Sequence, residues 1–433
     1  MNLKLDKVKK DTKESVIYIV KWTFIAVLVG LIVGIAAVVF TETLEFGIAL
    51  LVGLSDTWWV YILPVFGLFM SGWLTSTFAP EAAGHGTYAI IESYNENWGR
   101  INFIVVPVKL IASVFTIAFG GSAGKEGPTV QMGGGLGYLI GKKLKLSLAD
   151  TRKIVICGMA ASFGSIFTAP LAGGIFGAEV LYRDDMEYNM LFTSLVSSIT
   201  AYFLYAIVVG KERLFKFPIP ANYSFSPERD ILLFVGIGII AGIISLVYIK
   251  SLYGYEELNE HIKLPTYIQT AIGGALTGLM AIIATPLILG TGMSLVEQIS
   301  VQGGFSLGLL FLLLIGKILA TSFTIGSGGS GGVVAPSLTI GAITGAIIAR
   351  VINFDFPLAI ITATAAGVLG SAAHIPLTTS ILIAEIFGVE LIIPGTIVCF
   401  AGAWIARSDT LYRESYVSRF EMAKVLHHFG DNQ

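Results

Sequence analysis

Long apolar runs, separated by short polar or glycine-rich stretches, dominate the pattern of this chain. The first extends from Val16 to Phe40 with one charge inside it, Lys21, and comparable runs recur to about residue 406. A run of about 18–20 apolar residues can cross the hydrocarbon core of a bilayer as an α-helix. The first run is too long for the apolar part of a signal peptide. The pattern therefore predicts an all-α membrane protein whose first membrane helix begins near Val16.

The first half of the chain is repeated in the second half, at an offset of 206 to 208 residues. Four segments match in the same order, namely 79–90 with 285–296, 109–119 with 317–327, 121–133 with 329–341, and 163–179 with 369–385. The matching positions include glycine, proline, lysine and glutamate, which general apolar similarity does not explain. Many secondary transporters are duplicated in this way, with binding sites where membrane helices break.

Charge and polarity indicate where the two predicted repeats begin and end. The first fifteen residues carry five lysines, and the chain is basic again just after residue 406. Basic flanking segments favour the cytoplasmic side of a membrane. We therefore expect both termini in the cytoplasm and the protein in the cell membrane. The expected parts are a cytoplasmic segment 1–15, a first repeat 16–210, a polar inter-repeat loop 211–230, a second repeat 231–406 and a tail 407–433.

Two glycine-rich segments, 120–128 and 326–336, interrupt the apolar pattern, and each ends in a proline followed by an apolar run. Proline suits the first turn of a helix, where its missing N–H costs nothing. Irregular backbone at membrane depth is tolerated only where it lines an enclosed or wet cavity. The free N–H groups of a helix N-terminus attract anions. We predict two half-helices that face each other across an anion site near the bilayer midplane.

Glu126 lies within the first of these segments and places a carboxylate inside the membrane. Such a group costs about 2.5–3.5 kcal/mol on insertion scales, and a helix N-terminus returns about 0.3–2 kcal/mol. One interpretation is a helix cap. The other is a gate, in which the ionised side chain occupies the anion site and leaves when it is protonated or displaced. A phosphate-binding loop is excluded, because Glu126 stands where that motif carries a hydroxyl.

These motifs resemble those of the CLC family of chloride channels and chloride/proton antiporters, in the prokaryotic-type form without C-terminal CBS domains. The similar segments are GHGTY (84–88), GKEGP (124–128), GGVVAP (331–336) and the tripeptide at 410–412, and the resemblance spans about residues 20 to 415. It implies a CLC-type fold of two inverted-topology repeats, with broken half-helices that meet at the midplane. It also implies a homodimer with one pore per subunit.

The resemblance implies a role for individual residues. Glu126 would be the gate and proton acceptor. The anion-binding set would be the backbone N–H groups of Val333 and Val334, the hydroxyl of Tyr412, backbone groups near Lys125 and Gly127, and His85, which occupies the usual serine position. Tyr416 is close enough to Tyr412 to be the alternative central tyrosine.

One departure from the family concerns the inner proton relay. Val180 follows Glu179 at the position where proton-coupled members often carry a second glutamate, and valine cannot titrate. We therefore predict transport of chloride or a similar small anion, passive or weakly proton-coupled. The alternative is strict chloride/proton antiport, and nitrate or fluoride transport is less favoured. Tyr88 replaces the proline of the family motif at the start of that half-helix.

Two pairs of ionisable residues match each other in the repeat. Glu179 and Glu385 are expected to hydrogen-bond helix ends. Lys109 and Lys317 are expected to snorkel or to form salt bridges.

Composition narrows the function classes. The chain is 55% hydrophobic and 13% charged with a net charge of −2, which gives no basic bias towards nucleic acid. Cys157 and Cys399 have no metal-ligand spacing, so we expect neither a metal nor another cofactor. An intramembrane enzyme would need paired catalytic groups on neighbouring spans, and a cation carrier would need clustered carboxylates. Neither pattern is present in the sequence. The expected partners are the anion, protons, the lipid bilayer and a second copy of the chain.

Overall fold

The computed structural model describes residues 2–55, 57–210, 223–301, 304–413 and 415–421, and within them the chain is helical, without β-strands. Most of the predicted inter-repeat loop, 211–222, and the end of the predicted tail, 422–433, lie outside the described residues. The α-helices are α1 (Asn2–Ser55), α2 (Leu63–Phe78), α3 (Gly86–Glu96), α4 (Val105–Ala118), α5 (Glu126–Lys143), α6 (Leu148–Ile166), α7 (Pro170–Glu179), α8 (Leu191–Val208), α9 (Pro227–Glu260), α10 (Thr266–Ile283), α11 (Met293–Val301), α12 (Leu307–Gly326), α13 (Val334–Ile352), α14 (Pro357–Ala373), α15 (Pro376–Ile386) and α16 (Ile392–Ile405). Short 3-10 helices are η1 (Trp58–Tyr61), η2 (Pro80–Ala82), η3 (Tyr188–Met190), η4 (Pro286–Ile288) and η5 (Val389–Leu391).

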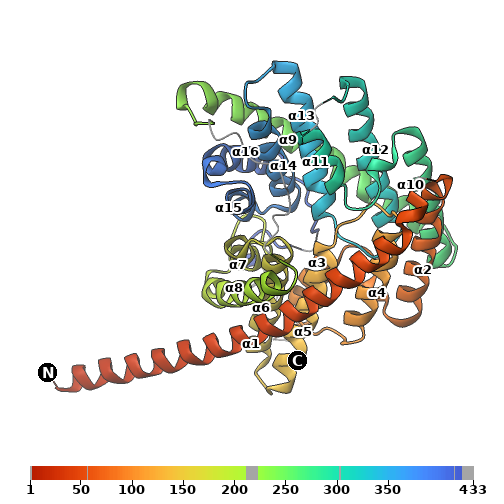
Figure 1. Ribbon diagram of the computed structural model, residues 1–433. Helices are drawn as coiled ribbons and strands as arrows, with labels where there is room; N and C mark the ends of the chain where they lie inside the picture. The colour runs from red at the N-terminus through yellow and green to blue at the C-terminus, as the bar shows by residue number, and fades with distance from the viewer. Residues whose placement is uncertain (1, 56, 211–222, 302–303, 414, 422–433) are drawn as a thin grey trace.

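The order of elements in the first half recurs in the second half. Helices α1 to α8 correspond in sequence to α9 to α16, and the short helices η2 and η3 correspond to η4 and η5. Figure 1 shows the two halves as neighbouring bodies, with α9 and α13–α16 above α5–α8 in that view. The duplication deduced from glycine, proline and lysine positions is therefore a duplication of structure, as in other inverted-repeat transporters.

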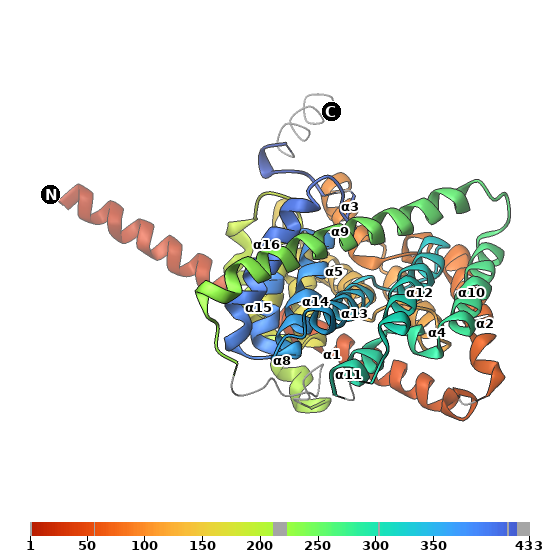
Figure 2. The ribbon, with the colours of Figure 1, turned by 90° about the horizontal axis from the view of Figure 1, so that it is seen from above.

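Within the residues that the structure describes, six helices are long and apolar enough to cross a membrane, and several shorter apolar helices lie between them. Many large apolar side chains on these helices are exposed, among them Phe24, Ile207 and Leu232. An exposed apolar belt of this extent suits contact with lipid. The first helix is longer than the predicted run from 16 to 40, since α1 is continuous from residue 2 to residue 55. Its N-terminal part extends beyond the rest of the molecule in both views (Figures 1 and 2).

The helix breaks predicted at the glycine-rich segments occur at the same place in both halves. α4 ends before Gly120, whose φ is +91°, and α12 ends before Gly328, whose φ is +94°. In each half the N–H of the next glycine, Gly121 or Gly329, bonds back to a carbonyl near the end of the helix, at 2.8 and 3.1 Å. Left-handed glycines end helices in this way because they lack a Cβ. The chain then turns into α5 or α13.

The two halves are also joined by reciprocal caps, as predicted for Glu179 and Glu385. The Glu179 carboxylate, at the end of α7, accepts hydrogen bonds from the N–H groups of Leu377 and Thr378 at 2.8 and 2.7 Å. The Glu385 carboxylate accepts from the N–H groups at the start of α7, at 3.0 and 2.8 Å. Each carboxylate therefore satisfies free donors of a helix N-terminus in the other half. The structural role predicted for this pair is confirmed.

Candidate anion-binding site

Three half-helix starts, those of α3, α5 and α13, meet at one point inside the molecule. The N–H of Gly124 donates to the carbonyl of Gly332 at 2.8 Å, and the N–H of Gly331 donates to the carbonyl of Gly84 at 3.2 Å. A Cβ on Gly127 would lie only 2.8 Å from the Cα of Gly332, so the two backbones are almost in contact. The glycine-rich sequence is required for this close approach.

Glu126, the first residue of α5, is buried at the junction, with 1% of its surface exposed. Its carboxylate lies over Gly124, where any side chain would collide with Oε2, and it faces the N–H groups of Glu126 itself and of Ala335 at the start of α13. Oε2 has no hydrogen-bond partner among the described residues. The carboxylate therefore occupies the position where two helix N-termini would otherwise present N–H donors to an anion.

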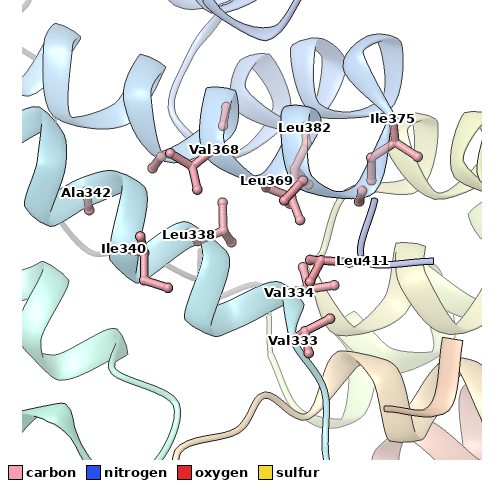
Figure 3. Close-up of a cluster of buried hydrophobic side chains, with 14 of the residues drawn as sticks. Val333, Val334, Leu338, Ile340, Ala342, Val368, Leu369, Ile375, Leu382 and Leu411 are labelled. Carbon is pink, nitrogen blue, oxygen red and sulfur yellow. The ribbon is translucent and has the colours of Figure 1, made fainter. Parts of the chain in front are cut away.

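Val333 and Val334 form the start of α13, and both are buried. Their side chains pack into the apolar cluster that Figure 3 shows, beside Leu411 of the C-terminal segment. Their N–H groups belong to the first turn of the helix, which has no acceptors for them inside the helix. The side chains anchor the helix start while the N–H groups remain available to a ligand.

Tyr412 is fully buried, and the polar groups that act on its hydroxyl are Thr87 and Glu126. Among the described residues, no acceptor is in place for the proton of this hydroxyl. The segment is held by hydrogen bonds from the Leu411 N–H to the Ala372 carbonyl, at 2.7 Å, and from Tyr253 Oη to the Leu411 carbonyl, at 2.6 Å. The hydroxyl is therefore aimed at the space between α3 and Glu126.

Tyr416, the alternative central tyrosine, lies elsewhere. It pairs with Tyr182 at the end of α7, and its carbonyl accepts from the Arg183 N–H at 3.0 Å. Tyr412, rather than Tyr416, thus faces the helix junction.

The C-terminal segment is fixed beside Tyr182 by Arg419, which contacts Asp185 at 3.1 Å. Desolvation alone would raise the pKa of Asp185, but hydrogen bonds from the Met186 N–H and from Arg419 hold this pKa below its usual value.

His85 precedes α3 and lies between the junction and an open cavity. Its ring is 6.1 Å from the ring of Tyr412 and 5.2 Å from that of Tyr88, measured between centroids. It is 8% exposed, and its Nδ1 has no hydrogen-bond partner among the described residues. The cavity, of about 690 Å³, is lined by His85, by Tyr253 and Glu256 of α9, and by Arg413. A buried ring nitrogen of this kind can donate to an anion or bond to water.

The expectation for Lys109 and Lys317 is wrong. Both are fully buried, and among the described residues neither pairs with a carboxylate. Lys109 Nζ donates to the carbonyls of Ala82 and Gly84, at 3.1 and 2.7 Å. Lys317 Nζ donates in the same manner to the carbonyls of Ile288 and Gly290, both at 2.9 Å. Backbone carbonyls satisfy the ammonium groups in place of acids, and each lysine fixes the loop that leads into a half-helix, α3 or α11.

The remaining predicted site residues have clear positions. Lys125 is the N-cap of α5, and its carbonyl accepts a hydrogen bond from the Thr129 hydroxyl at 2.7 Å. Val180 is the C-cap of α7 and is 1% exposed, in an apolar cluster. The structure thus brings Glu126, Gly127, Val333, Val334, Tyr412 and His85 to one junction, while Val180 lies at the end of another helix.

Sequence reasoning missed two residues of the junction, Thr87 and Tyr253. Thr87 is buried two residues after His85 and lies next to the Tyr412 hydroxyl. Tyr253 is far from the recognised motifs in the sequence and contacts the site only because α9 packs against the C-terminal segment. The position of Thr87 inside the GHGTY segment was a usable signal, but no pattern in the sequence marked Tyr253.

Comparisons with known proteins agree with this geometry. A family profile described as "Voltage gated chloride channel" matches residues 66–407. The chain is 31% identical over 397 residues to an uncharacterised protein of Methanocaldococcus jannaschii, covering 92% of this chain and 96% of that protein. It is 30% identical over 414 residues to the H(+)/Cl(-) exchange transporter ClcA of Salmonella typhi, covering 89% and 85% of the two chains.

Solved structures share the fold. A slow cyanobacterial Cl⁻/H⁺ antiporter superposes with a TM-score of 0.78 at 24% identity, covering 89% of this chain and 94% of that chain. A CLC-type fluoride/proton antiporter superposes with a TM-score of 0.83 at 22% identity, covering 92% and 98%.

Fold and site together define an integral membrane protein of the anion-transport class, built from two inverted repeats around opposed helix N-termini. The chain belongs to the voltage gated chloride channel family, that is, the CLC family of anion channels and transporters.

Replacing His85 with serine is expected to change anion preference without abolishing flux. The ring borders the junction. The Lys109 ammonium donates to the carbonyl of Gly84, next to His85, and its charge opposes a second positive charge on the imidazole. Exchange of one hydrogen-bond donor for a shorter one changes relative affinities by about 1 kcal/mol, or about five-fold. Nitrate, bromide and chloride fluxes in reconstituted vesicles measure this. An unchanged selectivity series would assign His85 a purely structural role.

Proposed function

We propose that this protein carries chloride, or a similar small anion, through a pathway gated by Glu126, with weak coupling to protons. The observation that carries the proposal is the buried carboxylate of Glu126, held between the starts of α5 and α13. Lys109, which is bonded to the loop before α3, is engaged by carbonyls. Lys125, the N-cap of α5, adds a positive charge that attracts the Glu126 carboxylate. Selectivity would rest on N–H and O–H donors together with this charge, all of which favour anions over cations.

In this mechanism the ionised Glu126 side chain occupies the anion position and blocks passage. Protonation removes its charge and with it the attraction to the N–H groups of α5 and α13. The side chain then leaves, and an anion takes its place against the N–H groups of Val333 and Val334. The hydroxyl of Tyr412 and the ring of His85 would bind the anion from the other side of the junction.

The surroundings of Val180 support weak coupling. The residue is buried in an apolar cluster and offers neither a titratable group nor a partner for water at the position of the family's inner relay. Strict chloride/proton exchange is the second candidate, and it is favoured by the similarity to the H(+)/Cl(-) exchange transporter of Salmonella typhi. The ratio of proton uptake to chloride flux, measured under a chloride gradient, distinguishes weak coupling from strict exchange.

Chloride is expected to carry the current in a KCl gradient. Once the Glu126 side chain has left, the helix junction presents N–H and O–H donors, which suit an anion and not a potassium ion. The reversal potential in a planar bilayer measures the selectivity. A value near the potassium equilibrium potential would overturn the proposed function as a whole.

A further inference from the structure

The cavity that His85 borders carries an unexpected charge for the entrance of an anion pathway. Three carboxylates line it, Glu256, Glu257 and Glu260, against one arginine, Arg413. A negative entrance lowers the local concentration of anions and raises that of protons. The cavity reaches the helix junction, since Gly84, His85 and Gly328 belong to the same lining. We call it the tail-side vestibule, because Arg413 of the C-terminal segment forms part of it.

Glu256 differs from the other two carboxylates in its position. Glu257 and Glu260 are exposed, whereas Glu256 is partly buried. It lies one helical turn from Tyr253 on the same face of α9, and this face is turned towards the site. The Tyr253 ring is 6.5 Å from the His85 ring, and its hydroxyl holds the segment that carries Tyr412. Glu256 is therefore the least exposed of the three vestibule carboxylates, and it lies one turn from a residue that contacts the site.

The charged and titratable groups around Glu256 come from three elements. α9 itself contributes Tyr253, Glu257 and Glu260, and the Arg413 guanidinium lies 3.5 Å from the centre of the Tyr253 ring, where it attracts the charge of Glu256. The start of α3 contributes His85 and Tyr88. The part of the lining that comes from α10, α12 and the loop after α12 is uncharged. Its polar groups include Gln269 and Ser327. Arg413 and Glu260 are thus the charged groups that act most directly on the Glu256 carboxylate.

We propose that Glu256 is the proton acceptor on the tail side of the anion pathway, in place of the carboxylate that Val180 lacks. This inference rests on the proposed function. A proton from the vestibule binds the Glu256 carboxylate and passes along hydrogen-bonded water beside His85 and Tyr412 to the carboxylate of Glu126. One O–H bond is broken and one formed at each transfer. Protons and anions share the vestibule, which explains why coupling between them is loose.

A rival entry lies nearer to Val180. The Glu187 carboxylate accepts a hydrogen bond from Tyr182 Oη at 3.2 Å and lies 3.9 Å from Arg419. It is thus engaged in the contact between the α7–η3 loop and the C-terminal segment, and it is not part of the vestibule lining. Glu187 is the alternative that the experiment must exclude.

The test measures chloride and proton movement together in vesicles containing the full chain, with a chloride electrode and a pH electrode. Glu256→Gln is expected to keep chloride flux and to lose proton movement down to the level of protein-free vesicles. Glu257→Gln is the matched control on the same helix and is expected to keep both. Glu187→Gln is expected to keep the ratio of protons to chloride. Glu256→His restores a titratable group, so proton movement should return, with a midpoint shifted towards about pH 6.5.

Each result decides the proposal. A wild-type proton-to-chloride ratio in Glu256→Gln overturns it, as does loss of proton movement in Glu187→Gln alone. If Glu256→Gln carries no chloride, the test rests on Glu256→His. Chloride flux without proton movement in Glu256→His would contradict the role of Glu256 as proton acceptor. Chloride flux without any proton movement in the wild type also overturns the inference, while leaving anion transport through the Glu126 gate intact.

Discussion

Replacement of Glu126 by glutamine is expected to preserve anion flux and to abolish its dependence on pH. In the wild-type protein the carboxylate blocks the junction while it is ionised, so flux should rise as the pH falls and the side chain becomes neutral. Glutamine has nearly the same shape but no charge to hold it against the N–H groups of α5 and α13. We expect flux in the variant to stay within about 10-fold of the wild type, a barrier change below about 1.4 kcal/mol, between pH 4 and 8.

Chloride efflux from vesicles at a series of pH values measures this effect. The matched control is Glu385→Gln, which neutralises another intramembrane carboxylate whose partners are N–H groups at the start of α7. That variant is expected to be less stable but to keep the wild-type pH profile. A Glu126→Gln protein that retains the wild-type pH profile would remove Glu126 from the role of gate.

Replacement of Lys109 by methionine is expected to weaken anion binding, whereas the same change at Lys317 is not. Each ammonium holds two carbonyls of an equivalent loop, but only the loop held by Lys109 leads to His85 and the site. Loss of a positive charge beside the loop that leads to the site costs about 1–2 kcal/mol of anion binding at an effective dielectric constant of about 20, or about 5- to 30-fold in affinity. Isothermal titration with chloride in detergent measures the difference.

Both lysine variants lose charge-assisted hydrogen bonds of about 1.5–3 kcal/mol each, so both should unfold at lower temperature. The comparison separates the electrostatic role of Lys109 from its structural role. Because of the duplication, each variant loses the same kind of hydrogen bonds to two backbone carbonyls, so the loss of stability should be similar. Equal chloride affinity in the two variants would show that the Lys109 charge does not act on the anion. Selective loss in Lys317→Met would place the site in the other half.

The sequence by itself determined the helical membrane class, the duplication and the residues at the helix breaks. Those features depend on local properties, namely the length of apolar runs, the conformational range of glycine and the fixed geometry of proline. Glu179 and Glu385 were also understood correctly, because a carboxylate among apolar residues requires donors, and helix starts supply them.

The tertiary structure decided what depends on neighbours distant in the chain. The choice between Tyr412 and Tyr416 follows from the packing of the C-terminal segment against α9 and α7, which two tyrosines four residues apart do not reveal. The partners of Lys109 and Lys317 are backbone carbonyls, and every residue has one, so composition could not single them out. The vestibule with Glu256 exists only because α9 passes beside the start of α3, where a carboxylate and the anion pathway share one cavity.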